Sequence, residues 1–238
     1  MRERTLPLPA SVLWPNLRAR STDPELLDAE LPESEVLKSL ADLRFVNRFL
    51  GARRALVRAI APQLPKGGSL LDVGCASGDV LAYLRSRLEP RFAVGLDIKA
   101  LHLSGAAQLH GVAGDVRRLP FAERSFDVVA ASLFLHHFDA PELPIVLGEL
   151  ARVARRAVVL CDLRRALVPY LFGRAVFPLL FETPVSVHDG LVSIRRGFRD
   201  AELREGFAQA GLGSVEIRRA FPYRLLAVAP LTGASRPA

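Results

Sequence analysis

The spacing of apolar residues along the chain changes near residue 68. Before that point they recur at helical spacing, which predicts a helix that begins at a Ser34 N-cap and continues to about residue 50. A second helical stretch is predicted over 52–64. The first 33 residues contain five prolines and are predicted to be irregular. We expect residues 1–67 to form a helical N-terminal cap segment on a larger domain.

From residue 68 onward, short apolar segments alternate with helical ones. Strands are predicted over 69–73, 92–98, 111–116, 126–132 and 157–163, and helices over 79–88, 99–109 and 141–155. The segment 126–132 is almost entirely apolar, as in a strand that is buried on both faces. This alternation predicts a parallel sheet with helices on both faces.

The end of the chain departs from this alternation. A predicted helix over 199–210 precedes two predicted strands, 214–221 and 224–229, which we expect to pair as an antiparallel hairpin at the sheet edge. Residues 164–198 form an insertion before that helix. The predicted fold class is therefore α/β: one domain of residues 68–238 with a doubly wound, mostly parallel seven-stranded sheet, an antiparallel C-terminal edge hairpin and an inserted lid over 164–198, joined to the helical N-terminal cap.

The charge of the chain leaves its partners open. The sequence has 32 basic and 25 acidic residues, a net charge of +7, and 29 of the basic residues are arginine. The arginines are scattered in short pairs, and no run of five like charges occurs. Nucleic acids and anionic membranes attract basic chains, but binding usually needs a clustered footprint. Charge therefore disfavours a nucleic-acid partner without excluding one.

The remaining composition indicates the cellular compartment. Cys75 and Cys161 lie far apart in apolar surroundings, so we expect both to be reduced thiols. The start of the chain has charges and prolines but no apolar leader segment. The longest apolar stretch, 166–181, contains Arg174 and is too short to span a bilayer. We expect a cytoplasmic protein without a transmembrane segment, and no metal site is predicted.

Residues 70–79, Leu-Leu-Asp-Val-Gly-Cys-Ala-Ser-Gly-Asp, leave a predicted strand and enter a predicted helix. Gly74 at the strand end allows a tight turn and a close approach by a ligand. Asp97 and Asp115 end the next two predicted strands, where an acid can accept hydrogen bonds from a ribose diol. Since the carboxyl ends of parallel strands meet at one edge, these residues predict a ligand that contains adenosine.

The glycine spacing argues against a dinucleotide. A G-x-G-x-x-G fingerprint that starts at Gly74 needs glycines where the chain has Ala76 and Asp79. Asp79 would also repel a pyrophosphate at the helix N-terminus. Asp72 instead suits a cation, such as the α-ammonium or sulfonium group of S-adenosylmethionine.

Residues 72–78 resemble motif I of the class I S-adenosylmethionine-dependent methyltransferases. Asp97 matches the acid after that family's second strand, Asp115-Val116 its adenine-edge position, and residues 119–129 the segment leading into its fourth strand. Leu-His-His-Phe at 135–138 has a form common among small-molecule methyltransferases of the ubiquinone/menaquinone-biosynthesis type. The resemblance covers residues 68–163 well, 185–230 less specifically, and the first 65 residues hardly at all.

The resemblance implies a Rossmann-like fold and S-adenosyl-L-methionine as the cofactor. It also implies the cofactor contacts residue by residue: Asp72, Gly74, Cys75, Gly78, Asp97, Ile98, Asp115, Val116 and Ser132. Ala76 stands where many members of the family have glycine. The alternative interpretation of Gly74 and Gly78 is an ordinary turn between a strand and a helix.

The segment after the fourth predicted strand bears on the substrate. A nucleic-acid amino methyltransferase of this class would carry Asn/Asp-Pro-Pro-aromatic there, whereas this chain has Ser-Leu-Phe-Leu at 132–135. In this family an insertion before the last helix often lies over the substrate pocket, and residues 164–198 are rich in Leu, Val and Phe. We therefore expect methyl transfer to O or C of a small aromatic or lipophilic substrate of the phenol, quinol or polyketide type. A plain core helix or a homodimer face is the alternative interpretation of the insertion.

Three residues are candidates for catalysis. His137 follows the fourth predicted strand, close to the expected methyl group. His188 beside Asp189 is a candidate base, and Arg195 can hold a substrate anion. A structural role is the alternative for each of them. Two other functions also remain open: an RNA methyltransferase, which the basic composition favours, and a catalytically inactive cofactor-binding protein.

Overall fold

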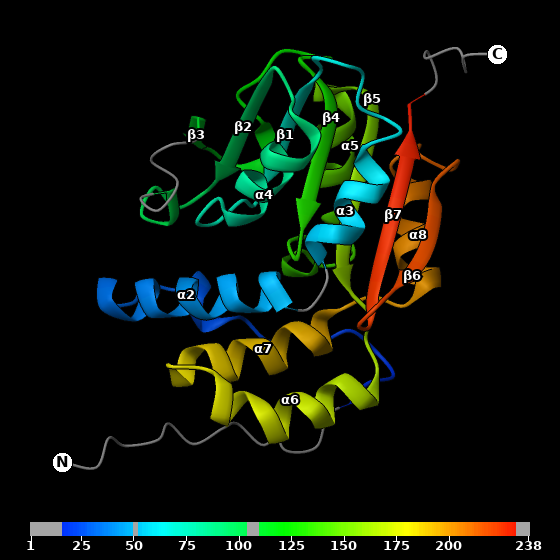
Figure 1. Cartoon of the computed structure of the whole chain (residues 1–238). Helices are drawn as coiled ribbons and strands as arrows, with labels where there is room; N and C mark the ends of the chain where they lie inside the picture. The colour runs from blue at the N-terminus through cyan, green and yellow to red at the C-terminus, as the bar shows by residue number, and fades with distance from the viewer. Residues whose placement is uncertain (1–15, 50–51, 104–109, 232–238) are drawn as a thin grey trace.

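The computed structural model describes residues 16–49, 52–103 and 110–231 and shows a seven-stranded sheet in the order β3-β2-β1-β4-β5-β7-β6 (Figure 1). The first five strands are parallel, and β7 pairs antiparallel with both β5 and β6. The strands are β1 Ser69–Val73, β2 Phe92–Asp97, β3 His110–Ala113, β4 Phe126–Ser132, β5 Ala154–Leu163, β6 Glu216–Ala220 and β7 Arg224–Pro230. The predicted mostly parallel sheet and its antiparallel edge hairpin are therefore confirmed.

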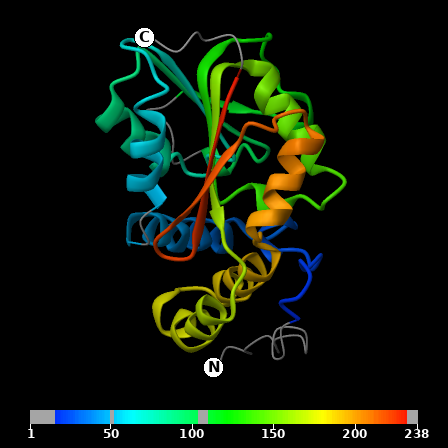
Figure 2. The same ribbon diagram turned by 90° about the vertical axis from the view of Figure 1, so that its right-hand side faces the viewer.

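Helices cover both faces of the sheet (Figure 2). Helices α3 Ala52–Ile60 and α4 Asp79–Leu88 pack on one face, whose buried cluster includes Leu56, Leu81 and Val159. Helices α5 Leu143–Val153 and α8 Asp200–Gln209 pack on the other face, around Leu147 and Phe207. Since both faces are covered, the central strands are almost continuously buried, as their apolar sequences predicted.

Two strand boundaries differ from the prediction by three residues, and the other differences are of one or two residues. Strand β3 ends at Ala113 rather than at residue 116, because the Asp115 side chain accepts a hydrogen bond from Arg117 N and starts the 3-10 helix η3 Val116–Arg118. Strand β5 begins at Ala154, which pairs with Phe126, although the sequence there is rich in arginine. Part of the helix predicted over 99–109 lies outside the described residues.

Three helices lie against the carboxyl ends of the parallel strands: α2 Glu33–Phe49, α6 Leu167–Leu180 and α7 Pro184–Arg196. Figure 1 shows β4 ending above α2, with α7 and then α6 beneath it. Buried residues Tyr170, Phe177, Leu191 and Ile194 form a separate apolar cluster that holds α6 on α7. Within the described residues, no helix combines the length and the apolar character needed to cross a membrane.

The N-terminal segment, residues 16–29, runs along α7 and the strand ends. The Asp189 carboxylate on α7 accepts the backbone N–H groups of Leu26 and Leu27 at 2.7 and 2.8 Å. From the other side, Lys99 Nζ donates to the carbonyl oxygens of Leu27 and Ala29 at 2.6 and 2.8 Å. These bonds hold the N-terminal segment across the carboxyl ends of the parallel strands.

The contribution of the main core to the free energy of unfolding can be tested by replacing one buried and one exposed leucine. We expect Leu147→Ala, at a fully buried position of α5, to lower the free energy of unfolding by about 2–5 kcal/mol, because it leaves a cavity in the main core. The measurement is urea denaturation followed by circular dichroism. Leu179→Ala on α6 is the matched control, since Leu179 is 83% exposed, and should change the stability little. Equal losses in the two variants would contradict this core assignment.

Candidate functional site

The turn between β1 and α4 has the conformation that its glycines predicted. Gly74 and Gly78 have φ angles of 67° and 72°, a region that glycine adopts without strain. A Cβ atom at Gly74 would lie 2.1 Å from Cδ2 of Phe134, so the turn also needs glycine for lack of space. Ala76 adopts a φ of 46° between them. Cys75 N donates to Leu96 O and Ala76 N donates to Asp97 Oδ2, so the turn is held against the end of β2.

Asp72 at this turn is a buried carboxyl group without a counter-charge. Its Oδ2 atom has no hydrogen-bond partner among the described residues, and neither has the Oγ atom of Ser132 on the neighbouring strand. Burial, together with the nearby Asp79 and Asp97, raises the pKa of Asp72 to about 8. Both side chains line a small cavity of about 30 Å³, with Gly74, Cys75 and Asn47. A cationic group such as an ammonium fits this arrangement, because it would supply the missing charge and donors.

Asp97 at the end of β2 has the opposite environment. Its Oδ2 accepts from Ala76 N at 3.0 Å, and its Oδ1 accepts from Lys99 N at 3.0 Å and lies 3.1 Å from His102 Nδ1. Burial opposes ionisation, but these hydrogen bonds together lower the pKa of Asp97. The carboxylate is therefore held in its charged form beside the β1–α4 turn.

The remaining predicted cofactor residues spread along the same edge. Gly114 N donates to Asp97 O, which brings the end of β3 beside the end of β2. Asp115 follows there, exposed and ion-paired with Arg117, while Val116 is buried and Ile98 is 63% exposed. Asp72, Gly74, Cys75 and Ser132 thus converge on the small cavity, whereas Asp97, Ile98, Asp115 and Val116 extend away from it along the strand ends. The cysteines, Cys75 and Cys161, are both buried free thiols.

A second, larger cavity of about 450 Å³ lies between the sheet edge and the three covering helices. Its walls are mainly apolar and come from α2, α6, α7 and the β6–β7 turn: Val46, Val168, Phe172, Phe177, Phe181, Ile194 and Phe221. Leu43 of α2 and Leu133 after β4 line both cavities. The two cavities are therefore neighbours that meet at these two leucines.

The three catalytic candidates are placed differently from one another. His137 lines the large cavity, but His188 and Arg195 are not among its lining residues. His188 Nδ1 lies 2.8 Å from Asp189 Oδ1, and Arg195 Nη2 donates to Asp23 Oδ2 at 2.7 Å. The structure therefore places His188 and Arg195 at the contact between α7 and the N-terminal segment, not at the cavity wall.

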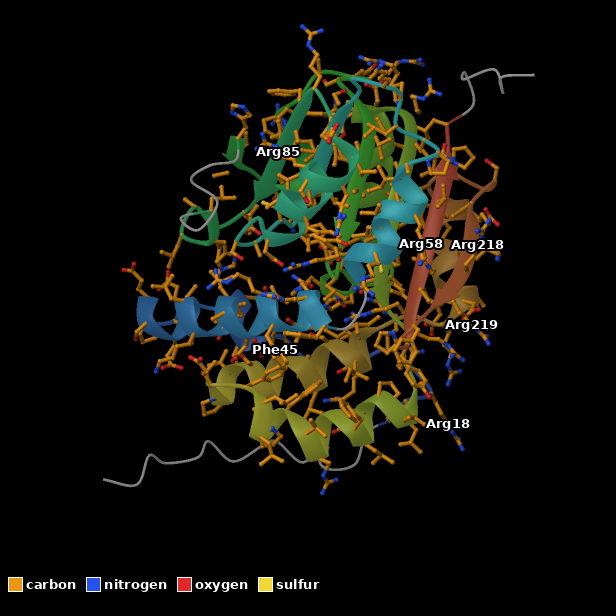
Figure 3. All side chains as sticks on the ribbon, in the orientation of Figure 1. Arg18, Phe45, Arg58, Arg85, Arg218 and Arg219 are labelled. Atoms are coloured by element: carbon orange, nitrogen blue, oxygen red, sulfur yellow. The ribbon has the colours of Figure 1, made fainter. Side chains whose placement is uncertain are left out.

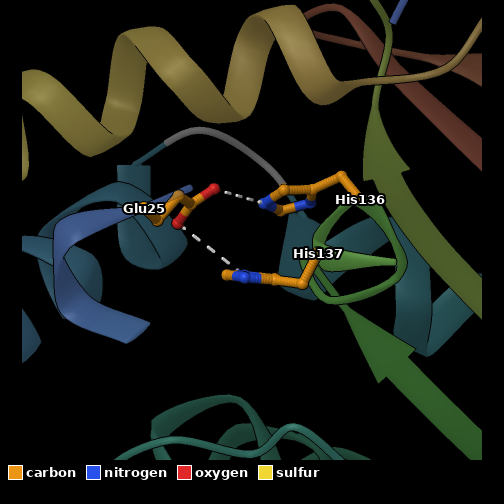
Figure 4. A group of neighbouring side chains, drawn as sticks. All are labelled: Glu25, His136 and His137. Carbon is orange, nitrogen blue, oxygen red and sulfur yellow. Dashed lines mark ion pairs between the residues drawn. The ribbon is translucent and has the colours of Figure 1, made fainter. Parts of the chain in front are cut away.

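Glu25 and His136 lie beside His137 (Figure 4). The sequence pointed to the two histidines in Leu-His-His-Phe at 135–138, but it missed Glu25. His136 Nδ1 lies 2.7 Å from Asp162 Oδ1, and its Nε2 lies 3.3 Å from Glu25 Oε1. Burial lowers the pKa of His136, but Asp162 and Glu25 outweigh this effect and raise it to about 9. Burial likewise raises the pKa of Glu25, while His137 and His136 bring it down to about 2. No sequence signal could identify Glu25, because it lies in an irregular segment without periodicity or motif.

The arginines that dominate the net charge come from separate parts of the molecule. In Figure 3, Arg58 lies on α3, Arg85 on α4, Arg218 and Arg219 on β6, and Arg18 near the start of the described chain. The structure therefore agrees with the scattered distribution seen in the sequence.

The uncompensated Asp72 carboxyl predicts a pH-dependent stability. The folded chain keeps the Asp72 proton up to about pH 8, whereas an unfolded chain releases it near about pH 4. The free energy of unfolding should therefore fall as the pH rises between these values. We expect urea unfolding of ligand-free Asp72→Asn to depend less on pH, with a larger gain over the wild type at about pH 8 than at about pH 5. Asp200→Asn, at an exposed site, should keep the wild-type slope, and an unchanged slope in Asp72→Asn would contradict the assignment.

Comparisons with known proteins agree with the features of this site. Residues 70–157 match the family described as "Methyltransferase domain". The chain is 32% identical over 136 residues to a demethylmenaquinone methyltransferase of Roseiflexus castenholzii, covering 53% of this chain and 56% of that protein. It is 31% identical over 96 residues to a fatty-acid O-methyltransferase of Mycolicibacterium smegmatis, covering 38% of this chain and 34% of that protein. The matches therefore span about half or less of the length of these curated relatives.

The fold has solved counterparts as well. A SAM-dependent methyltransferase from Aquifex aeolicus superposes with a TM-score of 0.62 at 15% sequence identity. The match covers 84% of this chain and 99% of that chain. The match is in fold, because the sequences have diverged widely. Residues 70–157 therefore match a methyltransferase domain, and the described fold is that of a solved SAM-dependent methyltransferase, which agrees with the resemblance of the sequence motifs to the class I family.

Proposed function

We propose that the chain transfers a methyl group from S-adenosyl-L-methionine to an oxygen or carbon atom of a small, lipophilic, phenol- or quinol-like molecule. The observation that carries this proposal is the contact between the two cavities at Leu43 and Leu133. One cavity has a carboxyl group without a counter-charge, and the other has apolar walls. A donor in the first and an acceptor in the second would meet at this boundary.

In this proposal the residues of the strand edge hold the cofactor. Asp72 and Ser132 would face its ammonium and carboxylate end, and the Gly74 turn would let its backbone approach closely. Asp97, already ionised, would accept hydrogen bonds from the ribose hydroxyls, and Asp115, Ile98 and Val116 would border the adenine. When bound, the cofactor supplies an electrophilic methyl group on a sulfonium.

The covering helices would position the substrate against the cofactor and exclude water from the large cavity. Methyl transfer from a sulfonium is an in-line displacement, so bringing the two reacting atoms into contact accounts for much of the rate enhancement. Helices α2, α6 and α7 surround the large cavity with apolar side chains, which keeps water from competing with the substrate. This arrangement supports the proposal that residues 164–198 act as a lid over a substrate.

The substrate class follows from the cavity wall. Its lining is mostly aliphatic and aromatic. Among its polar residues, Glu25, His136 and His137 form one close cluster, and Asp42, Asp189 and Arg224 also line the cavity. A molecule with one hydroxyl or acidic C–H on a lipophilic body matches such a wall. Two relatives are named for lipophilic substrates, a demethylmenaquinone and a fatty acid, which supports the same class here. We propose that the Glu25–His136–His137 cluster lies beside the reacting hydroxyl or C–H group of the substrate, and that His188 and Arg195 are positioning residues that hold the N-terminal segment.

The cofactor assignment can be tested by calorimetric titration with S-adenosylmethionine, S-adenosylhomocysteine and NADH. We expect the first two to bind and NADH not to bind. Asp97→Asn should weaken binding by roughly tenfold to a hundredfold, because it removes the charge from hydrogen bonds to the ribose. Asp200→Asn should bind like the wild type. Binding of NADH, or no loss in Asp97→Asn, would contradict this cofactor site.

The substrate assignment can be tested with a panel of lipophilic phenols and quinols and a labelled methyl group. We expect Phe172→Ala to raise the KM for the best acceptor about tenfold or more, because Phe172 lines the large cavity, while cofactor binding stays unchanged. Leu171→Ala is the control on the same helix, since Leu171 is equally exposed but lies outside the cavity lining. Label that enters tRNA or rRNA instead of these acceptors would overturn the proposal in favour of an RNA methyltransferase.

A further inference from the structure

We propose that Glu25, His136 and His137 bind one divalent transition-metal ion, of the zinc type, in the wall of the large cavity. Figure 4 shows the three side chains converging from the N-terminal segment and from the loop after β4. Their ligand atoms all lie within 4.8 Å of one another. Nothing in the sequence motifs pointed to a metal, so this site is a product of the tertiary structure.

The distances match tetrahedral coordination. His136 Nε2 lies 3.3 Å from Glu25 Oε1, and His137 Nε2 lies 3.8 Å from Glu25 Oε2. Nitrogen and oxygen ligands about 2.0–2.1 Å from a tetrahedral zinc ion are separated from each other by about 3.3 Å. An ion can therefore be accommodated between these atoms with small side-chain adjustments.

Neighbouring carboxylates orient both imidazole rings for such a role. His136 Nδ1 lies 2.7 Å from Asp162 Oδ1, and His137 Nδ1 lies 3.1 Å from Asp28 Oδ2. A ring that donates its Nδ1–H to a carboxylate presents the lone pair of Nε2, and metal-bound histidines typically have this partner. In the ion-free chain a proton lies between His136 Nε2 and Glu25 Oε1, and a divalent ion would take its place. Three electron-pair donors directed at one point are stabilised when a cation lies between them.

The surrounding contacts hold these ligands in place without occupying them. Arg196 donates to the backbone oxygens of His136 and His137 at 2.8 and 2.7 Å, and Arg20 donates to that of His136 at 3.2 Å. The cations thus bind the backbone of the loop and leave the imidazoles free to face Glu25. Ser193 Oγ lies 2.7 Å from Glu25 Oε1, which fixes the carboxylate from α7.

The donor set and its location suggest the role of the ion. Two imidazoles and one carboxylate suit zinc, cobalt or iron better than magnesium or calcium, which prefer oxygen ligands. All three residues line the large cavity, so an open coordination position would face it. If the proposed methyl transfer is correct, a substrate hydroxyl that takes this position would release its proton to water, because the ion stabilises the oxyanion. That oxygen would then form the new O–CH₃ bond as the S–CH₃ bond breaks, with the bonding electrons left on sulfur.

The metal site can be tested without any methyl transfer. The chain is freed of metal with a chelator and titrated with Zn²⁺ by calorimetry, and we expect one tight site per chain. Glu25→Gln and His136→Asn should each weaken Zn²⁺ binding by about tenfold or more. Glu30→Gln, at an exposed position of the same N-terminal part of the chain, and His110→Asn, on the edge strand β3, are the matched controls and should bind like the wild type. Equal affinity in all five proteins, or no binding to the wild type, would overturn the site.

Cobalt provides a second measurement that does not depend on the folding of a variant. Wild-type protein loaded with Co²⁺ should show the intense visible absorption of a four- or five-coordinate ion, whereas the weak spectrum of octahedral Co²⁺ would overturn the site. The calorimetric titration with S-adenosylmethionine keeps the two proposals apart. Metal binding without cofactor binding would refute the proposed function alone, and cofactor binding without metal binding would refute the metal site alone.

Discussion

The large cavity depends on the carboxylate of Asp189. Its two oxygen atoms accept the N–H groups of Leu26 and Leu27, which fixes the N-terminal segment on α7 at its short 3-10 helix, Leu26–Asp28. Backbone donors buried at such a contact need a partner, and a carboxylate supplies a stronger one than a neutral group. The contact places Glu25 in the cavity wall, where its exposed fraction is only 6%. Without this contact, the polar cluster would lose one of its three members.

Two aspartates on neighbouring strands have different pKa values because their surroundings differ. Asp72 and Asp97 both end strands at the same edge of the sheet. Among the described residues Asp72 has no donor for its Oδ2, and burial raises its pKa to about 8, whereas Asp97 receives backbone and histidine hydrogen bonds that lower its pKa. A carboxyl that is costly to ionise in the empty fold gains most from a cationic ligand. Part of the binding energy of such a ligand would therefore come from the relief of a buried, uncompensated charge.

Three polar residues in the wall of the large cavity, Glu25, His136 and His137, lie close together although they come from distant parts of the chain. Helices α6 and α7 are joined by their own apolar cluster, while Asn47 of α2 and Arg53 of α3 both donate to Asp79 at the start of α4. The cavity between them is closed by side chains from four distant parts of the chain. A buried cluster of this kind is stable only when each member has a partner, which Asp162, Asp28 and Ser193 provide.

The sequence by itself determined the sheet, the β1–α4 turn and the acids at the strand ends. These features depend on local signals: apolar runs, glycines that adopt positive φ, and an acid directly after each strand. Strands β1 and β4 and helix α4 have the predicted boundaries, whereas β3 is shortened by the Asp115 cap, a side-chain contact that apolar spacing does not report. Only the tertiary structure decided which polar residues face the large cavity. His188 and Arg195 appeared suited to catalysis because of their neighbours in the sequence, yet packing turns them toward the N-terminal segment. Glu25 and His136 meet because a segment without periodicity crosses the strand edge, and such a contact between distant residues leaves no pattern in the sequence.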